Sequence, residues 1–116
     1  MYCTFCDIIA RTEPATIYYE DEEVIVFENL LRWVPVMLLV APKLHMSQEE
    51  LWENIGPVAR IAMEMGKKYC PNGFRLLSNF GHDAMQSQSH AHVHVIGGAH
   101  LGLYVRERLL ATWPFR

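Results

Sequence analysis

The chain has 116 residues, is 51% hydrophobic and carries a formal net charge of −3. This length suits a single compact domain, residues 1–116, with an ample core. The slightly acidic balance disfavours a nucleic-acid-binding protein, which usually carries a basic face. No apolar run is long enough to span a bilayer, and the N-terminus lacks the pattern of a signal peptide. We therefore expect a cytoplasmic protein with no membrane or nucleic-acid partner.

Five segments are predicted to form β-strands, after a short helical turn near the N-terminus. Residues 16–20 and 23–29 are rich in β-branched and aromatic residues and flank an acidic pair, which indicates a hairpin. Residues 35–42 form a nearly continuous apolar run bounded by prolines, which is typical of a central strand. Two further strands are expected at residues 73–80 and 90–96, separated by a polar loop.

One long helix is expected between the third and fourth strands. Ser47 and Glu50 form a capping-box signature. Apolar residues then recur at steps of three and four, as on an amphipathic helix: Leu51, Ile55, Val58, Ala62, Met65 and Tyr69. Strands that follow one another without regular helical crossovers indicate an antiparallel sheet. The predicted class is thus an α+β fold with one long and one short helix, and the tail after residue 98 is ambiguous.

Residues 89–98 read SHAHVHVIGG and place three of the six histidines at every second position. On a strand, His90, His92 and His94 would share one face and the valines between them the other. Chance placement on an exposed strand, or a single metal-chelating pair, is the alternative. His90 and His94 would lie about 13 Å apart along the backbone, whereas zinc–nitrogen bonds are about 2 Å long. The row is therefore predicted to serve more than one role.

Cys3 and Cys6 form a C-x2-C motif. With three cysteines in all, the odd number argues against a disulfide framework. A redox motif would be expected near a βαβ pattern, and no strand is predicted before this one. The favoured interpretation is half of a closed, structural zinc site completed by His45 and His90. Reduced cysteines in a surface turn are the alternative.

If His90 binds zinc, His92 and His94 remain for chemistry. A neutral imidazole is a good nucleophile and titrates near neutral pH. Neutral donors for a phosphate, besides the backbone amides of the polar loop, come from three nearby side chains: Asn79, Gln86 and Ser87. Simple turn capping is the competing interpretation for two of them, Asn79 and Ser87.

Residues 79–98 resemble the signature of the histidine triad (HIT) family, H-φ-H-φ-H-φ-φ with φ apolar. The resemblance extends to the segment LLVAPKLH and to the N-terminal C-x2-C-D-I-I of many bacterial members. The family fold is a five-stranded antiparallel sheet with two helices, usually in a homodimer. The Gly97-Gly98 ending is closer to the nucleoside phosphoramidase branch. Trp113-Pro114 resembles a C-terminal element that borders the partner subunit's site in that branch.

The resemblance implies an enzyme that binds purine nucleotides and hydrolyses a bond at the α-phosphorus. His92 would attack phosphorus and form a nucleotidyl-histidine intermediate, from which water releases the nucleoside monophosphate. The implied phosphate contacts are His94, Asn79, Gln86 and Ser87. The implied zinc ligands are Cys3, Cys6, His45 and His90. Asn29 stands where the family usually has an aspartate that binds the ribose, and it is the expected ribose contact here.

Other positions also differ from the family pattern: Arg32 and Trp33 in the segment LLRWVP, Met37 and Met85. These differences concern ribose and base recognition, whereas the phosphate chemistry matches the family. Nucleoside phosphoramidates or related adenylates are the expected substrates. A dinucleoside polyphosphate hydrolase or a nucleotidyltransferase is one alternative. A zinc-stabilised nucleotide-binding module with negligible turnover is the other, although the intact His92 favours an enzyme.

Overall fold

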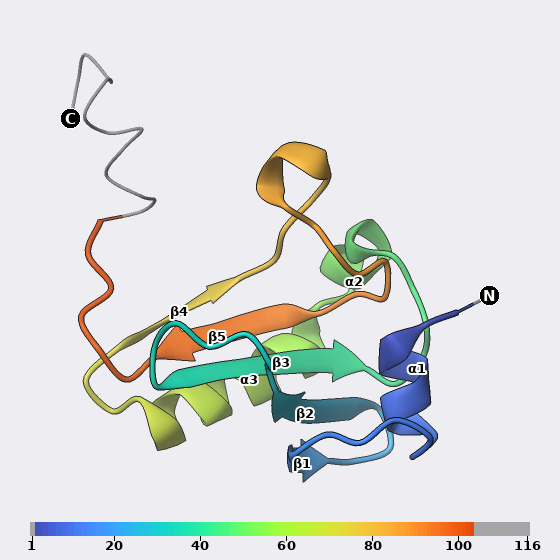
Figure 1. The fold of residues 1–116 in the computed structure, drawn as a ribbon, viewed down its shortest axis with the longest axis horizontal. Helices are drawn as coiled ribbons and strands as arrows, with labels where there is room; N and C mark the ends of the chain where they lie inside the picture. Colours follow the sequence, from blue (N-terminus) through green and yellow to red (C-terminus); the bar gives the residue numbers. More distant parts are fainter. Residues whose placement is uncertain (1, 104–116) are drawn as a thin grey trace.

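The protein was studied as a computed structural model, which describes residues 2–103 (Figure 1). The Trp113-Pro114 pair lies outside the described residues. Five strands form one antiparallel sheet in the order β1-β2-β3-β5-β4. Their bounds are Ile17–Glu20 (β1), Val24–Glu28 (β2), Val36–Pro42 (β3), Phe74–Leu77 (β4) and Val93–Gly97 (β5). The predicted α+β class and five-stranded antiparallel sheet are confirmed.

The two faces of the sheet are covered differently. The long helix α3, Gly56–Tyr69, packs across the face that lies behind the sheet in Figure 1. Val93 and Val95 belong to the core on that side, together with helix residues such as Ile61. The alternation predicted for the histidine strand therefore holds, because its valines face the core formed with α3. A smaller cluster on the opposite face packs strand residues against the N-terminal helix α1, Thr4–Ile9.

The segment after Ser47 forms two helices and not the single long one that was expected. The capping box of Ser47 and Glu50 is present and begins the short helix α2, Gln48–Glu53. α3 then starts at Gly56, with a proline in its first turn. Pro57 has no N–H group and its ring collides with the carbonyl four residues earlier, so one helix cannot run through this point. The spacing of apolar residues continues across this point and therefore does not indicate the helix break. The pair Gly56-Pro57 does indicate it.

Some of the predicted site residues lie just outside the paired strands, whereas His94 lies within β5. The last residue pairs are Leu77↔His94 between β4 and β5, and Val40↔Val93 between β3 and β5. Residues 78–80, predicted as strand, lie outside β4, and residues 90–92 precede β5. A short 3-10 helix at His82–Ala84 lies in the polar loop between them. Backbone groups of these extensions must therefore find partners other than a neighbouring strand.

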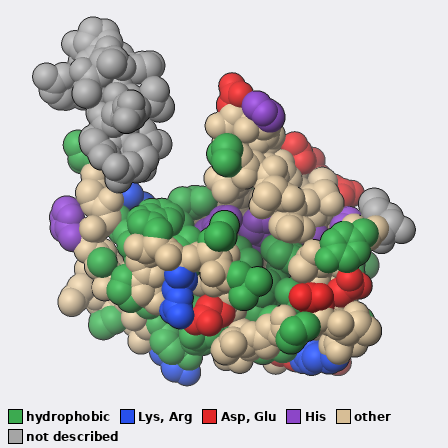
Figure 2. All heavy atoms as spheres, in the orientation of Figure 1, with side chains coloured by type: hydrophobic (Ala, Val, Ile, Leu, Met, Phe, Trp, Pro, Cys, Tyr) green, Lys and Arg blue, Asp and Glu red, His purple; other side chains and the backbone are tan. Residues whose placement is uncertain are grey.

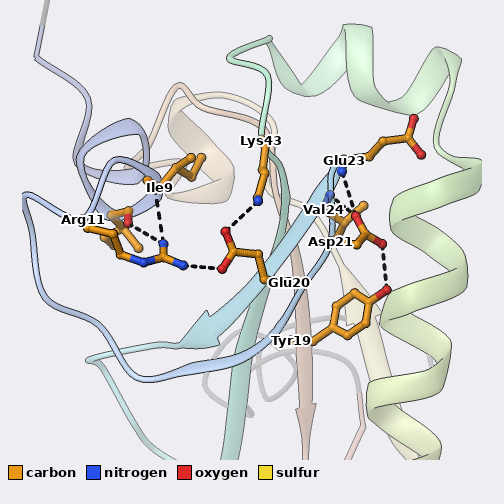
Figure 3. A network of polar contacts seen from close by, with 9 residues as sticks. Ile9, Arg11, Tyr19, Glu20, Asp21, Glu23, Val24 and Lys43 are labelled. Carbon is orange, nitrogen blue, oxygen red and sulfur yellow. Dashed lines mark hydrogen bonds and ion pairs between the residues drawn. The ribbon is translucent and has the colours of Figure 1, made fainter.

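The N-terminal segment is fastened to the sheet by the ion-pair network in Figure 3. The guanidinium of Arg11 bonds the carbonyl groups of Ile8 and Ile9 at the end of α1 and pairs with Glu20 of β1. The other carboxylate oxygen of Glu20 lies 2.6 Å from Nζ of Lys43, just after β3. The contact with Lys43, followed by that with Arg11, lowers the pKa of Glu20. Three elements thus meet at one carboxylate.

In the part of the chain that the structure describes, no helix combines the length and apolar character needed to cross a membrane.

Ile61 is expected to be a main contributor to the core between sheet and helix, because its side chain is 0% exposed. Replacing it with alanine should lower the free energy of unfolding by about 2–5 kcal/mol, through lost burial and a cavity. Met63, on the same helix but 41% exposed, provides the control. Met63→Ala should change stability by about 0.5 kcal/mol or less. Urea denaturation measures both; equal losses would contradict the packing described here.

Candidate functional site

A cleft of about 720 Å³ opens on the face of the sheet opposite α3. Its walls are formed by α1, by residues 29–33 after β2 and by the loop between β4 and β5. In Figure 2, histidine side chains are visible at the base of the projecting loop, inside the hollow. One end of the cleft is polar. The side chains that line it are Asn79, Ser87, Gln88, His92 and His94.

His92 is held in one orientation and in one tautomer. Its imidazole is only 4% exposed, and Nδ1 donates to the carbonyl oxygen of His90 at 2.8 Å. Since a carbonyl can only accept, Nδ1 carries the proton of the neutral ring and Nε2 keeps a free lone pair. Burial lowers the pKa of His92, although the bond to His90 opposes the shift. The ring is therefore neutral at pH 7, as a nucleophile must be.

His94 lies beside His92, with the ring centroids 5.0 Å apart. Burial and, to a lesser extent, the neighbouring His92 lower the pKa of His94 to about 4. His94 can thus offer a neutral N–H to a ligand without placing a positive charge beside the neutral His92. Phe5 of α1 closes the other side, with its ring edge-on to His92 at 5.1 Å between centroids. The first helix is therefore a wall of this site.

The four predicted phosphate contacts are not placed alike. Asn79, Ser87 and His94 line the cleft together with His92. Gln86 is turned into its own loop, where Oε1 accepts from the Gly81 amide at 2.9 Å and Nε2 donates to the Gln88 carbonyl at 3.1 Å. Its side chain therefore shapes the loop.

In the loop between β4 and β5, two residues that line the cleft, Met85 and Gln88, were not identified from sequence as contacts. Met85 adopts a left-handed backbone conformation with φ 62°. Neither residue belongs to a spacing pattern that would have identified it.

At the other end of the cleft, Asn29 and the segment that follows it form the rim. The side-chain oxygen of Asn29 accepts from the Leu31 amide at 2.9 Å, so its NH2 group remains available to a ligand. Arg32 pairs with Glu28 at 3.3 Å. Trp33 is mostly exposed, and its backbone N–H donates to the sulfur of Met37 at 3.2 Å. Asn29, Arg32, Trp33 and Met37, four of the positions that differ from the family pattern, thus lie at this rim, whereas Met85 lies in the loop between β4 and β5.

Apolar side chains from α1, β2 and β3 form the floor of that end, and sequence analysis did not single them out as a binding surface. They are Phe5, Ile8, Phe27 and Leu39. The alternation of residues on the two strands could have signalled this apolar face.

The predicted zinc ligands converge on one point beside the start of α1. Ligand atoms of Cys3, Cys6, His45 and His90 all lie within 4.8 Å of one another. Nδ1 of His90 is 3.5 Å from each sulfur, and Nδ1 of His45 is 3.4 Å from the Cys6 sulfur. The two Nδ1 atoms are 3.1 Å apart.

These separations fit a tetrahedral zinc ion. With bonds of about 2.3 Å to sulfur and about 2.0 Å to nitrogen, neighbouring sulfur and nitrogen ligands lie about 3.5 Å apart and two nitrogens about 3.3 Å apart. Nε2 of His90 donates to the Pro42 carbonyl at 2.7 Å, which leaves Nδ1 free to bind the metal. Without an ion, burial and the adjacent Cys3 raise the pKa of Cys6 to about 11. A bound cation would reverse this effect and hold both thiols as thiolates.

Residues 10–101 match the sequence profile of the HIT domain. An uncharacterized 13.1 kDa HIT-like protein of Mesomycoplasma hyorhinis is 41% identical over 98 residues, covering 79% of this chain and 88% of that protein. The structure is similar to a HIT family hydrolase from Clostridium thermocellum, with TM-score 0.80, 33% identity and coverage of 90% of this chain and 96% of the other. It is also similar to a zinc-bound histidine triad family protein from Mycobacterium smegmatis, with TM-score 0.77, 25% identity and coverage of 88% and 78%.

The ligand geometry predicts zinc at a ratio of roughly one ion per chain. Metal analysis of tag-free protein should find it, and Cys3→Ser or Cys6→Ser should reduce the content to near zero, because a tetrahedral site loses a thiolate ligand. Cys70→Ser is the matched control, since this third cysteine is buried away from the cluster and should leave the metal content unchanged. Wild-type protein that contains no zinc after purification in zinc-supplemented buffer would contradict the assignment.

Proposed function

This chain belongs to the HIT domain family, and we propose that it hydrolyses a nucleotidyl substrate at its α-phosphorus through a covalent intermediate on His92. One observation carries the proposal. The ring of His92 faces the cleft as a neutral imidazole, with Nδ1 bound to the His90 carbonyl and Nε2 free. A buried imidazole with a free lone pair beside neutral donors suits attack on a phosphate.

In the proposed reaction, Nε2 of His92 forms a bond to phosphorus while the bond from phosphorus to the leaving group breaks. His94, Asn79 and Ser87 donate to the phosphate oxygens, where negative charge builds up in the transition state. Water then attacks the same phosphorus, the N–P bond breaks and His92 recovers its neutral form. Dividing one displacement into two steps is the usual advantage of covalent catalysis.

Charge in the cleft favours a substrate with few phosphates. Among the residues that line it in the described part of the chain, Arg32 is the only lysine or arginine, and it is paired with Glu28. A polyphosphate chain would lack cations to balance it. This supports nucleoside phosphoramidates or adenylates over dinucleoside polyphosphates. The volume of the cleft lies within the usual range of small-molecule sites, about 300–1,000 Å³, and its apolar end suits a purine.

Zinc is proposed to have a structural role. Four protein ligands would complete its coordination and leave no open position for substrate. The ligand His90 supplies the carbonyl that orients His92, so the metal would act on the reaction only by fixing this residue.

We also propose that the protein forms a homodimer. β1 and β4 are the two edges of the sheet, and an unpaired edge exposes backbone groups that can pair with another chain. Several large apolar side chains are exposed as well: Leu30, Leu31, Trp33 and Met85 among them.

His92→Ala should reduce turnover of an adenosine phosphoramidate by about 10³-fold or more, because no nucleophile remains. Binding of adenosine monophosphate should persist, since the other phosphate donors are retained. Rapid mixing followed by intact-mass measurement should find a nucleotidyl adduct on the wild type and none on the variant. His82→Ala, at the exposed loop tip, is the control and should keep wild-type rates. A variant at position 92 that keeps most of its activity would exclude the covalent mechanism.

Sedimentation equilibrium of the full chain should give twice the chain mass of 13.4 kDa. The measurement should extend to low micromolar concentration, where weak non-specific association would dissociate. A monomer mass throughout this range would contradict the proposed dimer and leave the proposal for catalysis unaffected.

A further inference from the structure

The backbone of His92 lies just beyond the reach of both neighbouring strands. β3 pairs with β5 as far as Val93, and β4 pairs with β5 from His94 onward. The peptide groups of His92 are nevertheless satisfied, in each case by a side chain. Gln48 Oε1 accepts from the His92 N–H at 3.0 Å, and Ser78 Oγ donates to the His92 carbonyl at 2.6 Å. Side chains thus continue the sheet's hydrogen bonding for one more residue.

Gln48 also bonds a second part of the site. Its side chain is polar yet only 1% exposed, at the start of α2. Its Nε2 donates to the carbonyl of Asn79 at 3.3 Å. The orientation of the amide is fixed by chemistry, because the oxygen must face an N–H and the nitrogen a carbonyl. One buried side chain therefore connects the backbone of the proposed nucleophile to the backbone of a proposed phosphate contact.

We infer that Gln48 is a positioning residue, which sets the distance between the His92 ring and the phosphate held near Asn79. This inference rests on the proposed function. Gln48 does not line the cleft, so it acts only through these two backbone groups. Removing the Gln48 side chain would leave the His92 backbone N–H without this restraint. The bond from His92 Nδ1 to the His90 carbonyl, which selects the tautomer, would then be weakened.

The segment around Gln48 is itself held by hydrogen bonds, as a positioning residue requires. The capping box of Ser47 and Glu50 fixes the start of α2. The Met46 carbonyl accepts from the Ala91 amide at 2.9 Å, directly beside the Gln48 contact. The backbone N–H groups of two consecutive residues, Ala91 and His92, are thus both bonded to this segment. These two bonds restrict movement of the His92 ring.

Gln48→Met tests the inference, because methionine has similar length but neither hydrogen-bonding group. We expect kcat for an adenosine phosphoramidate to fall about 10- to 100-fold, with KM changed less than about threefold because the cleft lining is untouched. The control is Glu49→Met, the next residue on the same helix and exposed, which should keep wild-type kinetics. An unchanged kcat despite a lower melting temperature would overturn the inference and leave Gln48 a structural residue.

A second readout does not depend on turnover. Nitrogen NMR of ¹⁵N-histidine-labelled protein reports which ring nitrogen of His92 carries the proton. The wild type should have a single tautomer with Nδ1 protonated, and Gln48→Met should have a mixture. If the wild type hydrolyses no nucleotide, the proposed function fails, but the tautomer still decides the role of Gln48. Should Gln48→Met not fold, Gln48→Asn keeps the amide but is one methylene too short to bond both the His92 N–H and the Asn79 carbonyl. An unchanged kcat and tautomer in that variant would overturn the inference.

Discussion

His90 is the residue on which the arrangement of the whole site depends. Its ring faces the sulfur atoms of Cys3 and Cys6 through Nδ1 and the Pro42 carbonyl through Nε2. Its backbone carbonyl accepts a hydrogen bond from Nδ1 of His92. One residue therefore belongs to the proposed metal site, to the end of β3 and to the proposed nucleophile. Each of these contacts restrains the same short segment. A shift of His90 at any one contact would therefore alter the other two.

The N-terminal helix takes part in this arrangement although it contributes no catalytic group. Cys3 and Cys6 hold its start near His90, while Arg11 holds its end to Glu20 and through it to Lys43. Phe5 between them forms the wall beside His92. A six-residue helix has little stability of its own in water. Its position is thus set by attachments at both ends, and the shape of the cleft follows from them.

The sequence predicted those parts of the molecule that depend on local periodicity. Strand alternation placed Val93 and Val95 in the core, and the C-x2-C motif with two histidines indicated the ligand set that the structure brings together. Periodicity failed at Pro57, where a continuous apolar stripe crosses a helix break. It also gave no sign of Gln48, because a single buried amide that bonds two distant backbones leaves no repeating pattern. Resemblance named Gln86 as a phosphate contact, but only the folded loop reveals where its amide points.

The ligands of the proposed metal site come from opposite ends of the folded sequence, and this has a consequence for how the protein is assembled. Cys3 and His90 are 87 positions apart. Contacts of such long range form late in folding, since the intervening chain must first be ordered. Metal capture would then come after the sheet is complete, and it would retard unfolding more than it speeds folding. During synthesis, Cys3 and Cys6 would therefore remain free thiols until the chain has been extended past His90.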